Sequence, residues 1–200
     1  MTTPAGRRLT EAHRLAQLRL GSLTVERMRA IWRLLDPERL DGTFEDWLTT
    51  AIPIIAAQRQ ASARLAGAYL TALRVIEVGL EDNLTPVLRE EPDRQALAAS
   101  LLVTGPLSVK RAMTRGVSIQ QAMGVAEAAS AASSMRHALD GGRETITATV
   151  GADPRADGYQ RVTSAGACSY CSKLAGIRFA HDRVFRAHDG CSCNAEPVYR

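Results

Sequence analysis

All four cysteines of this 200-residue chain lie between residues 168 and 193, and His188 lies close to the last two of them. Cys168 and Cys171 form a C-x2-C pair, and His188, Cys191 and Cys193 follow after a loop. Thiolates and imidazoles are the ligands that zinc prefers, and two short-spaced groups of donors separated by a loop are a common construction of structural zinc sites. The spacing therefore predicts one zinc ion. Five donors compete for four positions, so the sequence leaves open which of them is excluded.

Disulfides or unrelated thiols would give the cysteines a different chemistry. Four cysteines could form two disulfides, but the first eight residues carry no apolar secretory core, so we expect a protein kept in a reducing interior. Buried, unrelated thiols are the second alternative, and the Ser, Gly, Arg and Asp around the cysteines are too polar for a core segment. Among the other histidines, His13 and His137 lack neighbouring cysteines, and His181, between the two groups, is a less favoured substitute ligand.

We expect the zinc ion to stabilise the fold of the residues beyond Pro154 and to take no part in a reaction. Residues beyond Pro154 have little apolar area with which to order themselves. A structural zinc ion supplies on the order of 10 kcal/mol of folding free energy to a small finger. A zinc ion held by four protein ligands also has no open position for a catalytic water. The sequence thus predicts a structural cofactor.

Composition indicates that helices position this segment. Aromatic residues make up only 4% of the chain, whereas alanine and leucine are abundant, which favours helices packed through small and aliphatic side chains. The net charge of +4 is mild, and it is compatible with a position near nucleic acid without requiring one. No apolar run approaches the roughly 20 residues of a membrane-spanning helix. We therefore expect a soluble, mainly α protein with no membrane partner and no small-molecule substrate.

Apolar residues recur at spacings of three and four through most of the chain, as in amphipathic helices. Gly21–Thr24 is a candidate break, Pro53 a candidate kink, and Asp140–Gly142 is expected to interrupt the last long helix. Residues 144–150 are rich in β-branched side chains, but we assign them to a helix. The expected helices cover residues 9–35, 43–52, 54–80, 93–103, 107–115, 119–139 and 144–150, with a break at 83–92.

The pattern changes at Pro154. Residues 158–163, 176–179 and 196–199 have the composition of short strands, separated by turns that carry the cysteines. The expected organisation is a helical assembly domain over residues 1–153, followed by a small zinc-binding α+β module over residues 154–200.

The C-terminal motif resembles a known family. The runs Gly158–Thr163, Cys168–Gly176, Ala187–Cys193 and Glu196–Tyr199 are similar to the C-terminal signature of MuF-like minor head proteins of tailed phages, particularly phages of actinobacteria. The resemblance covers about a fifth of the chain. Its C-x2-C and H-x2-C-x-C pattern is matched here, although Asp189–Gly190 replaces the more usual proline and asparagine after the histidine.

This resemblance implies a minor capsid protein, present in few copies in the phage head and in the host cytoplasm during assembly. Its expected partners are the portal and other head proteins, with possible contact to DNA. Relatives are often labelled capsid maturation proteases. That alternative is less favoured, because His188 is expected to bind the metal and no H-E-x-x-H helix is present.

A zinc-ribbon nucleic-acid binder is a further alternative. In that case basic residues around the metal would contact phosphates. The candidates are Lys173, Arg178, Arg183 and Arg186. Basic residues near a zinc module are more often solvated loop charges, so the head-assembly interpretation comes first.

Overall fold

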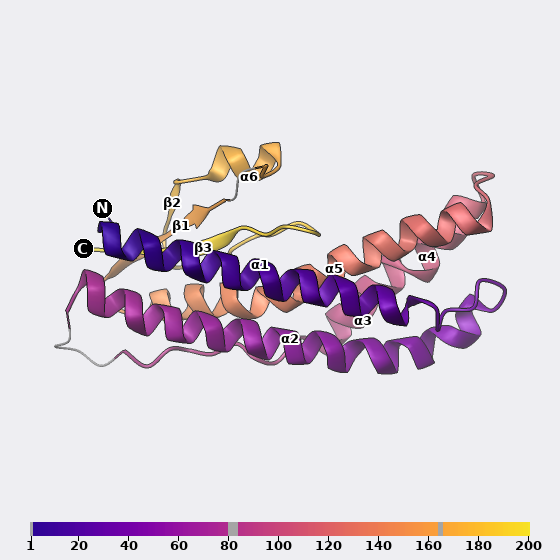
Figure 1. Cartoon of the computed structure of the whole chain (residues 1–200), viewed down its shortest axis with the longest axis horizontal. Coiled ribbons are helices and arrows are strands. Elements are labelled where there is room, and N and C mark those ends of the chain that lie inside the picture. Colours follow the sequence, from indigo (N-terminus) through magenta and orange to yellow (C-terminus); the bar gives the residue numbers. More distant parts are fainter. Residues whose placement is uncertain (1, 80–83, 164–165) are drawn as a thin grey trace.

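Three long helices lie alongside one another in the computed structural model of the chain (Figure 1). The structure describes residues 2–79, 84–163 and 166–200. The long helices are α1 (Pro4–Trp32), α2 (Leu40–Glu77) and α5 (Ile119–Ala152). Two shorter helices, α3 (Arg94–Thr104) and α4 (Pro106–Met113), pack against α5. The last elements are β1 (Ala156–Val162), α6 (Ser169–Leu174), β2 (Arg178–Phe179) and β3 (Asn194–Tyr199).

Local signals account for several helix ends. The hydroxyl of Ser118 accepts a hydrogen bond from the backbone N–H of Gln121 at 3.4 Å, and the Asp93 carboxylate accepts one from Ala96 at 2.9 Å. Both are N-caps, which satisfy backbone donors that a helix start leaves open. Pro106 occupies the first turn of α4, where its missing N–H costs nothing. The predicted helices near 93–103, 107–115 and 119–139 and the helical assignment of 144–150 are confirmed.

The predicted breaks at Gly21–Thr24 and Asp140–Gly142 were wrong, because α1 runs through Gly21 and α5 runs through Gly141 and Gly142. The helices predicted at 43–52 and 54–80 are parts of the single helix α2, which contains Pro53, and a kink at this proline stays a prediction. At Gly141 an added Cβ would lie 2.4 Å from the carbonyl oxygen of Arg59 on α2. Glycine there permits close helix approach, and packing against α2 offsets its helix cost of about 1 kcal/mol.

Other boundaries shifted slightly. α2 ends at Glu77, and Gly79 follows with a φ of +100, a left-handed conformation that glycine adopts readily. The predicted helix end at residue 80 and the start of the break at residue 83 lie outside the described residues. Among the described residues, no helix combines the length and apolarity needed to cross a membrane.

The C-terminal strands form a three-stranded antiparallel sheet in the order β2-β1-β3. Tyr159 on the central strand pairs with Phe179 on one side and Pro197 on the other. Gly158 has a φ of +120, and a Cβ there would lie 2.1 Å from the carbonyl oxygen of Phe179. The three predicted strands are thus confirmed in position, but the segment after Cys168, expected to be a turn, is the short helix α6.

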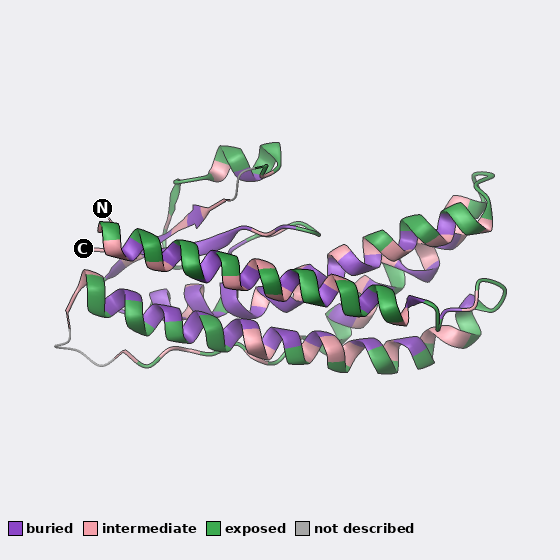
Figure 2. Ribbon diagram, in the orientation of Figure 1, coloured by how far each residue is buried: buried purple, intermediate pink, exposed green. Residues whose placement is uncertain are grey.

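Buried side chains form two apolar clusters, and the long helices turn their buried faces toward one another (Figure 2). The first cluster contains Trp32, Trp47, Ile55 and Leu101, contributed by α1, α2 and α3. Between the clusters lies a buried polar contact, in which the Ser62 hydroxyl donates to Gln17 at 2.8 Å and accepts from the Gly142 N–H at 2.9 Å.

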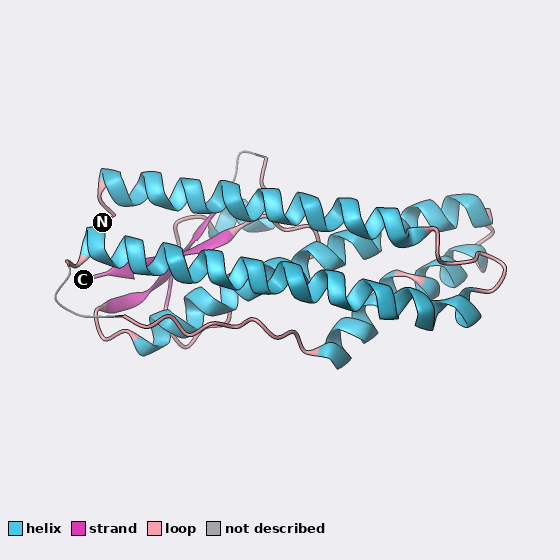
Figure 3. Ribbon diagram, turned by 60° about the horizontal axis from the view of Figure 1, so that its bottom comes forward, coloured by secondary structure: helices cyan, strands magenta, loops and turns pink. Residues whose placement is uncertain are grey.

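The second cluster joins the helices to the C-terminal module. It combines α2 and α5 residues with strand, loop and cysteine side chains, and the sheet lies toward the end of the bundle that holds both termini (Figure 3). Its members include Tyr69, Leu70, Leu73, Ile146, Val150, Tyr159, Cys171, Phe185, Cys191 and Cys193. A buried ion pair between Arg74 and Asp153, at 2.9 Å, lies next to the boundary predicted at 153/154. Whether the two parts fold separately stays a prediction.

Candidate metal centre

The five predicted donors lie together in space. Cys168, Cys171 and His188 form one group, and Cys171, Cys191 and Cys193 form another, with all ligand atoms in each group within 4.8 Å of one another. Cys171 belongs to both groups. Within the described residues, this cluster is thus two overlapping triads that share one buried thiol.

The distances between donors suit a metal with sulfur and nitrogen ligands. The Nε2 atom of His188 lies 3.0 Å from Cys168 Sγ and 3.5 Å from Cys171 Sγ, and the sulfurs of Cys171 and Cys191 are 3.6 Å apart. Ligands on a tetrahedron around zinc, at Zn–S of about 2.3 Å and Zn–N of about 2.0 Å, lie roughly 3.4–3.8 Å from one another. These three distances are close to those between ligands of one zinc ion, and an ion held by four of the donors requires the two triads to approach each other.

His188 is oriented for ligation. Its Nδ1–H donates a hydrogen bond to the carbonyl oxygen of Asp189 at 2.9 Å. In a neutral imidazole this leaves the lone pair on Nε2, the atom that faces Cys168 and Cys171. A histidine ligand whose other nitrogen donates to a carbonyl is a common arrangement in metal sites.

Local structure places the C-x2-C pair. Cys168 is the N-cap of α6, and its sulfur accepts a hydrogen bond from the Cys171 N–H at 3.4 Å. This hydrogen bond is the largest cause of a lowered pKa of the Cys168 thiol. One helical turn then brings Cys171 back to the same side of the chain, where it is buried. The short helix therefore positions the pair that the sequence assigned to a turn.

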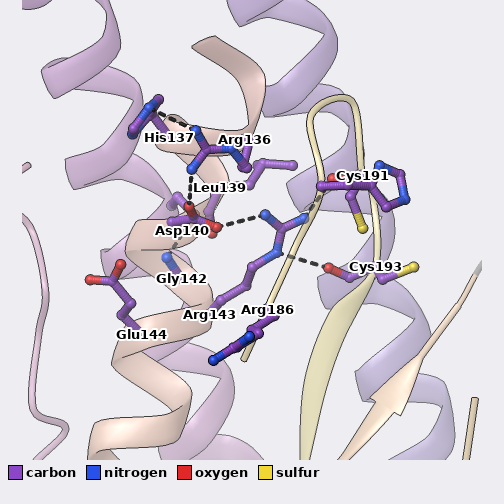
Figure 4. A network of polar contacts seen from close by, with 12 residues as sticks. Arg136, His137, Leu139, Asp140, Gly142, Arg143, Glu144, Arg186, Cys191 and Cys193 are labelled. Atoms are coloured by element: carbon purple, nitrogen blue, oxygen red, sulfur yellow. Dashed lines mark hydrogen bonds and ion pairs between the residues drawn. The ribbon is translucent and has the colours of Figure 1, made fainter. Parts of the chain in front are cut away.

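Helix α5 holds the second group of donors. Arg143 donates to the carbonyl oxygens of Cys193, at 3.0 Å, and Cys191, at 2.5 Å, and it pairs with Asp140 at 2.8 Å (Figure 4). Its side chain is almost fully buried. Two turns earlier, Arg136 pairs with Asp189 at 2.6 Å.

The backbone adds a further contact, because the Gly190 N–H donates to the carbonyl oxygen of Ala132 at 3.0 Å. The loop from His188 to Cys193 is thus docked along α5.

A second arginine borders the first group. Arg161 on β1 lies 3% exposed, with its guanidinium 3.9 Å from the ring centroid of Phe185 and 3.8 Å from Cys171 Sγ. It donates to the carbonyl oxygen of Arg186 at 2.6 Å, whereas its Nε has no partner within the described part of the chain. A buried cation is costly without a negative charge nearby. A metal bound by three or four thiolates carries a net negative charge, which Arg161 would balance.

The buried cysteines affect one another's protonation. A hydrogen bond from Cys193, opposed by burial and aided by the charge of Arg143, lowers the pKa of Cys191. The same contact raises the pKa of Cys193, and burial adds to that rise. One thiolate is thus already favoured at the centre, and metals bind cysteine as the thiolate.

The structure also bears on catalysis by a cysteine. Cys168 and His188, at 3.0 Å, have the separation of a nucleophile and its base. However, Cys171 contacts the same nitrogen, and Cys191 and Cys193 lie just behind it. Convergence of further thiols on the pair is expected for a metal site and has no role in a dyad.

The remaining histidines lie elsewhere. His13 stacks on Tyr69 with ring centroids 4.3 Å apart, and Arg136 contacts His137 at 3.0 Å. Burial lowers the pKa of each to about 4. His181 is exposed and belongs to neither donor group.

Sequence reasoning missed Arg143 and Arg161. Neither is next to the cysteines in the chain, and an arginine in a helix or strand of ordinary composition gives no local signal. Only the fold brings the two side chains to the donors.

Comparison with known proteins gives one result. A family model described as VG15 protein matches residues 5–200. Neither the search of curated proteins nor the search of solved structures gave a match.

Proposed function

We propose that this chain, which belongs to the VG15 protein family, is a minor head protein of a tailed phage whose C-terminal cysteines and histidine hold a structural zinc ion. The family indicates a phage-related virion protein. The position in the head, the zinc and the partners are our proposal. The convergence of the other four donors on Cys171 is the observation that carries the zinc site, and the family match supports the role in a virion.

The zinc ion would link the α6 segment of the C-terminal module to the loop that is bound to helix α5. Cys168 and Cys171 belong to the α6 segment, whereas Cys191 and Cys193 are tied to α5 through Arg143. When bound, the ion supplies coordination bonds between these segments. The protein's own residues provide the rest: Arg143 holds the loop, Asp189 orients His188, and Arg161 offsets thiolate charge.

A candidate contact surface for the portal lies at the other end of the bundle. Helices α3 and α4 and the start of α5 lie there, away from both termini (Figure 1). Several large apolar side chains of these segments are exposed, of which Val125 is 64% exposed. They are Leu102, Val103, Met113, Val117 and Val125. Exposed apolar groups of this kind are frequent where a protein binds another protein.

The test is an infection with phage that carry substitutions in this chain. Val125→Lys with Met113→Lys should reduce co-purification with the portal and lower the fraction of filled heads, because charge at an apolar contact is costly. A matched control, Leu15→Lys with Leu23→Lys, places the same charges on exposed positions of α1. An equal loss of portal binding in both double variants would argue against the portal contact. So would normal portal binding and a normal fraction of filled heads in the variant at Val125 and Met113.

Processing of the major capsid protein separates this proposal from the protease alternative. Replacement of Cys168 by Ser should leave the size of the capsid protein in infected cells unchanged. If uncleaved capsid protein accumulates while the variant still binds metal and enters heads, a protease with Cys168 as nucleophile replaces our assignment.

A further inference from the structure

An open groove lies on the outer side of the C-terminal module, next to the donor cluster. Its volume is about 660 Å³, and it is lined by side chains from β1, α6, β2 and the segment before His188. Tyr159 and Phe179 stack with centroids 5.4 Å apart and form its apolar floor. Tyr170, on α6, borders it and is 51% exposed.

The groove is basic. Arg161, Arg183 and Arg186 line it, against one acidic residue, Asp182. Arg178 pairs with Asp157 at 3.7 Å, but Arg183 and Arg186 pair with no carboxylate among the residues that the structure describes. Residues 154–200 contain seven Lys and Arg and four Asp and Glu, so most of the chain's +4 charge belongs to this module.

The backbone of residues 183–186 is held by hydrogen bonds from two side chains of β1. The hydroxyl of Tyr159 donates to the carbonyl oxygen of Arg183 at 3.1 Å, and Arg161 donates to that of Arg186 at 2.6 Å. Between them Phe185 is buried under the Arg161 guanidinium, whereas Val184 is 76% exposed. Arg183 and Arg186 are therefore carried by a backbone that the module fixes.

We propose that this groove binds single-stranded nucleic acid, with phosphates on Arg183 and Arg186 and a base stacked on Tyr170. A basic groove with exposed aromatic rings is how proteins bind unpaired strands without sequence preference, because every base presents a flat face. In a duplex the base faces are covered by their neighbours, so Tyr170 would have nothing to stack on. This binding activity goes beyond the head-assembly role and does not depend on it.

The test measures anisotropy of a fluorescein-labelled oligothymidine with the full, metal-loaded chain over a range of salt concentrations. Arg183→Gln with Arg186→Gln should weaken binding and lower the slope of log K against log salt by about 1.4, since each phosphate contact on a single strand contributes about 0.7. The control Arg111→Gln with Arg115→Gln removes the same charge near α4 and should bind as the parent does. An equal loss of affinity in both variants would mean that the oligonucleotide is attracted by the net charge of the protein alone, and it would overturn the proposal that the groove binds it.

The base contact has its own control. Tyr170→Ala should weaken binding roughly fivefold to 150-fold with an unchanged salt slope, because stacking on one base contributes about 1–3 kcal/mol. Tyr170→Phe keeps the ring and should bind normally, and Asp182→Asn should bind more tightly. Wild-type affinity in Tyr170→Ala, or equal affinity of the parent chain for duplex and single strand, would contradict the proposal.

Discussion

Arg143 donates from Nε to the carbonyl oxygen of Cys193 at 3.0 Å, although 50 positions separate the two residues in the chain. The same guanidinium reaches the carbonyl of Cys191, so one buried side chain of α5 sets the path of the loop that carries two candidate ligands. The candidate metal centre is thus joined to the helices by direct hydrogen bonds.

Replacing Arg143 with Leu should weaken zinc binding about 10- to 100-fold, as loss of groups that orient ligands does in other metal sites. Competition with a chromophoric chelator measures the affinity. Arg136→Gln removes a more exposed ion pair with Asp189, which is worth about 1 kcal/mol or less, and should change affinity less than about fivefold. Affinity unchanged by the Leu substitution would mean that the loop is held by its backbone alone.

The position of Cys171 in both donor groups predicts a hierarchy among the cysteines. Cys171→Ser should abolish stoichiometric zinc binding. Cys193→Ser should retain part of it, since Cys193 belongs to only one of the two triads. Elemental analysis of the purified variants gives the metal content. The opposite order, or metal-free parent protein with paired thiols, would contradict the zinc assignment.

Loss of zinc is expected to loosen the chain after Pro154 and to leave the helices folded. Limited proteolysis of Cys171→Ser should cut near residues 152–155 while helical circular dichroism persists. The second apolar cluster spans this boundary, so collapse of the helical signal would show that module and bundle fold together.

His13 should make the protein less stable in acid. Burial lowers its folded-state pKa from 6.5 to about 4, and its Nε2 has no partner in the described structure. Because the unfolded chain binds the proton more readily, stability is complete above pH 6.5 and falls as the pH drops toward 4, by roughly 3 kcal/mol at most.

His13→Phe should keep the stack on Tyr69 and flatten this part of the pH dependence in urea unfolding. His137, shifted in the same direction, accounts for the acid loss that persists. A steep dependence identical to that of the parent would place the acid sensitivity elsewhere.

Two glycines of α5 should respond oppositely to alanine. A Cβ at Gly142 would lie 2.7 Å from both Gln17 Nε2 and Ser62 Oγ, so Gly142→Ala is expected to cost about 1–3 kcal/mol. At Gly124 an added Cβ would meet nothing within 4 Å, so Gly124→Ala should stabilise the helix by up to about 1 kcal/mol. Thermal unfolding distinguishes them. Equal shifts in both variants would show that α5 does not approach α2 and α1 closely at Gly142.

The amino-acid sequence by itself determined the helical class, the three short strands and the grouping of the donors. These depend on local signals: hydrophobic spacing, the alternation of short apolar runs with turn residues, and cysteine spacing. Only the tertiary structure decided that Gly21, Pro53 and Gly141 lie inside continuous helices, because packing between helices offsets local costs that the sequence makes visible. It also decided the roles of Arg143 and Arg161, since a guanidinium reaches its partners through space and their distance along the chain carries no signal.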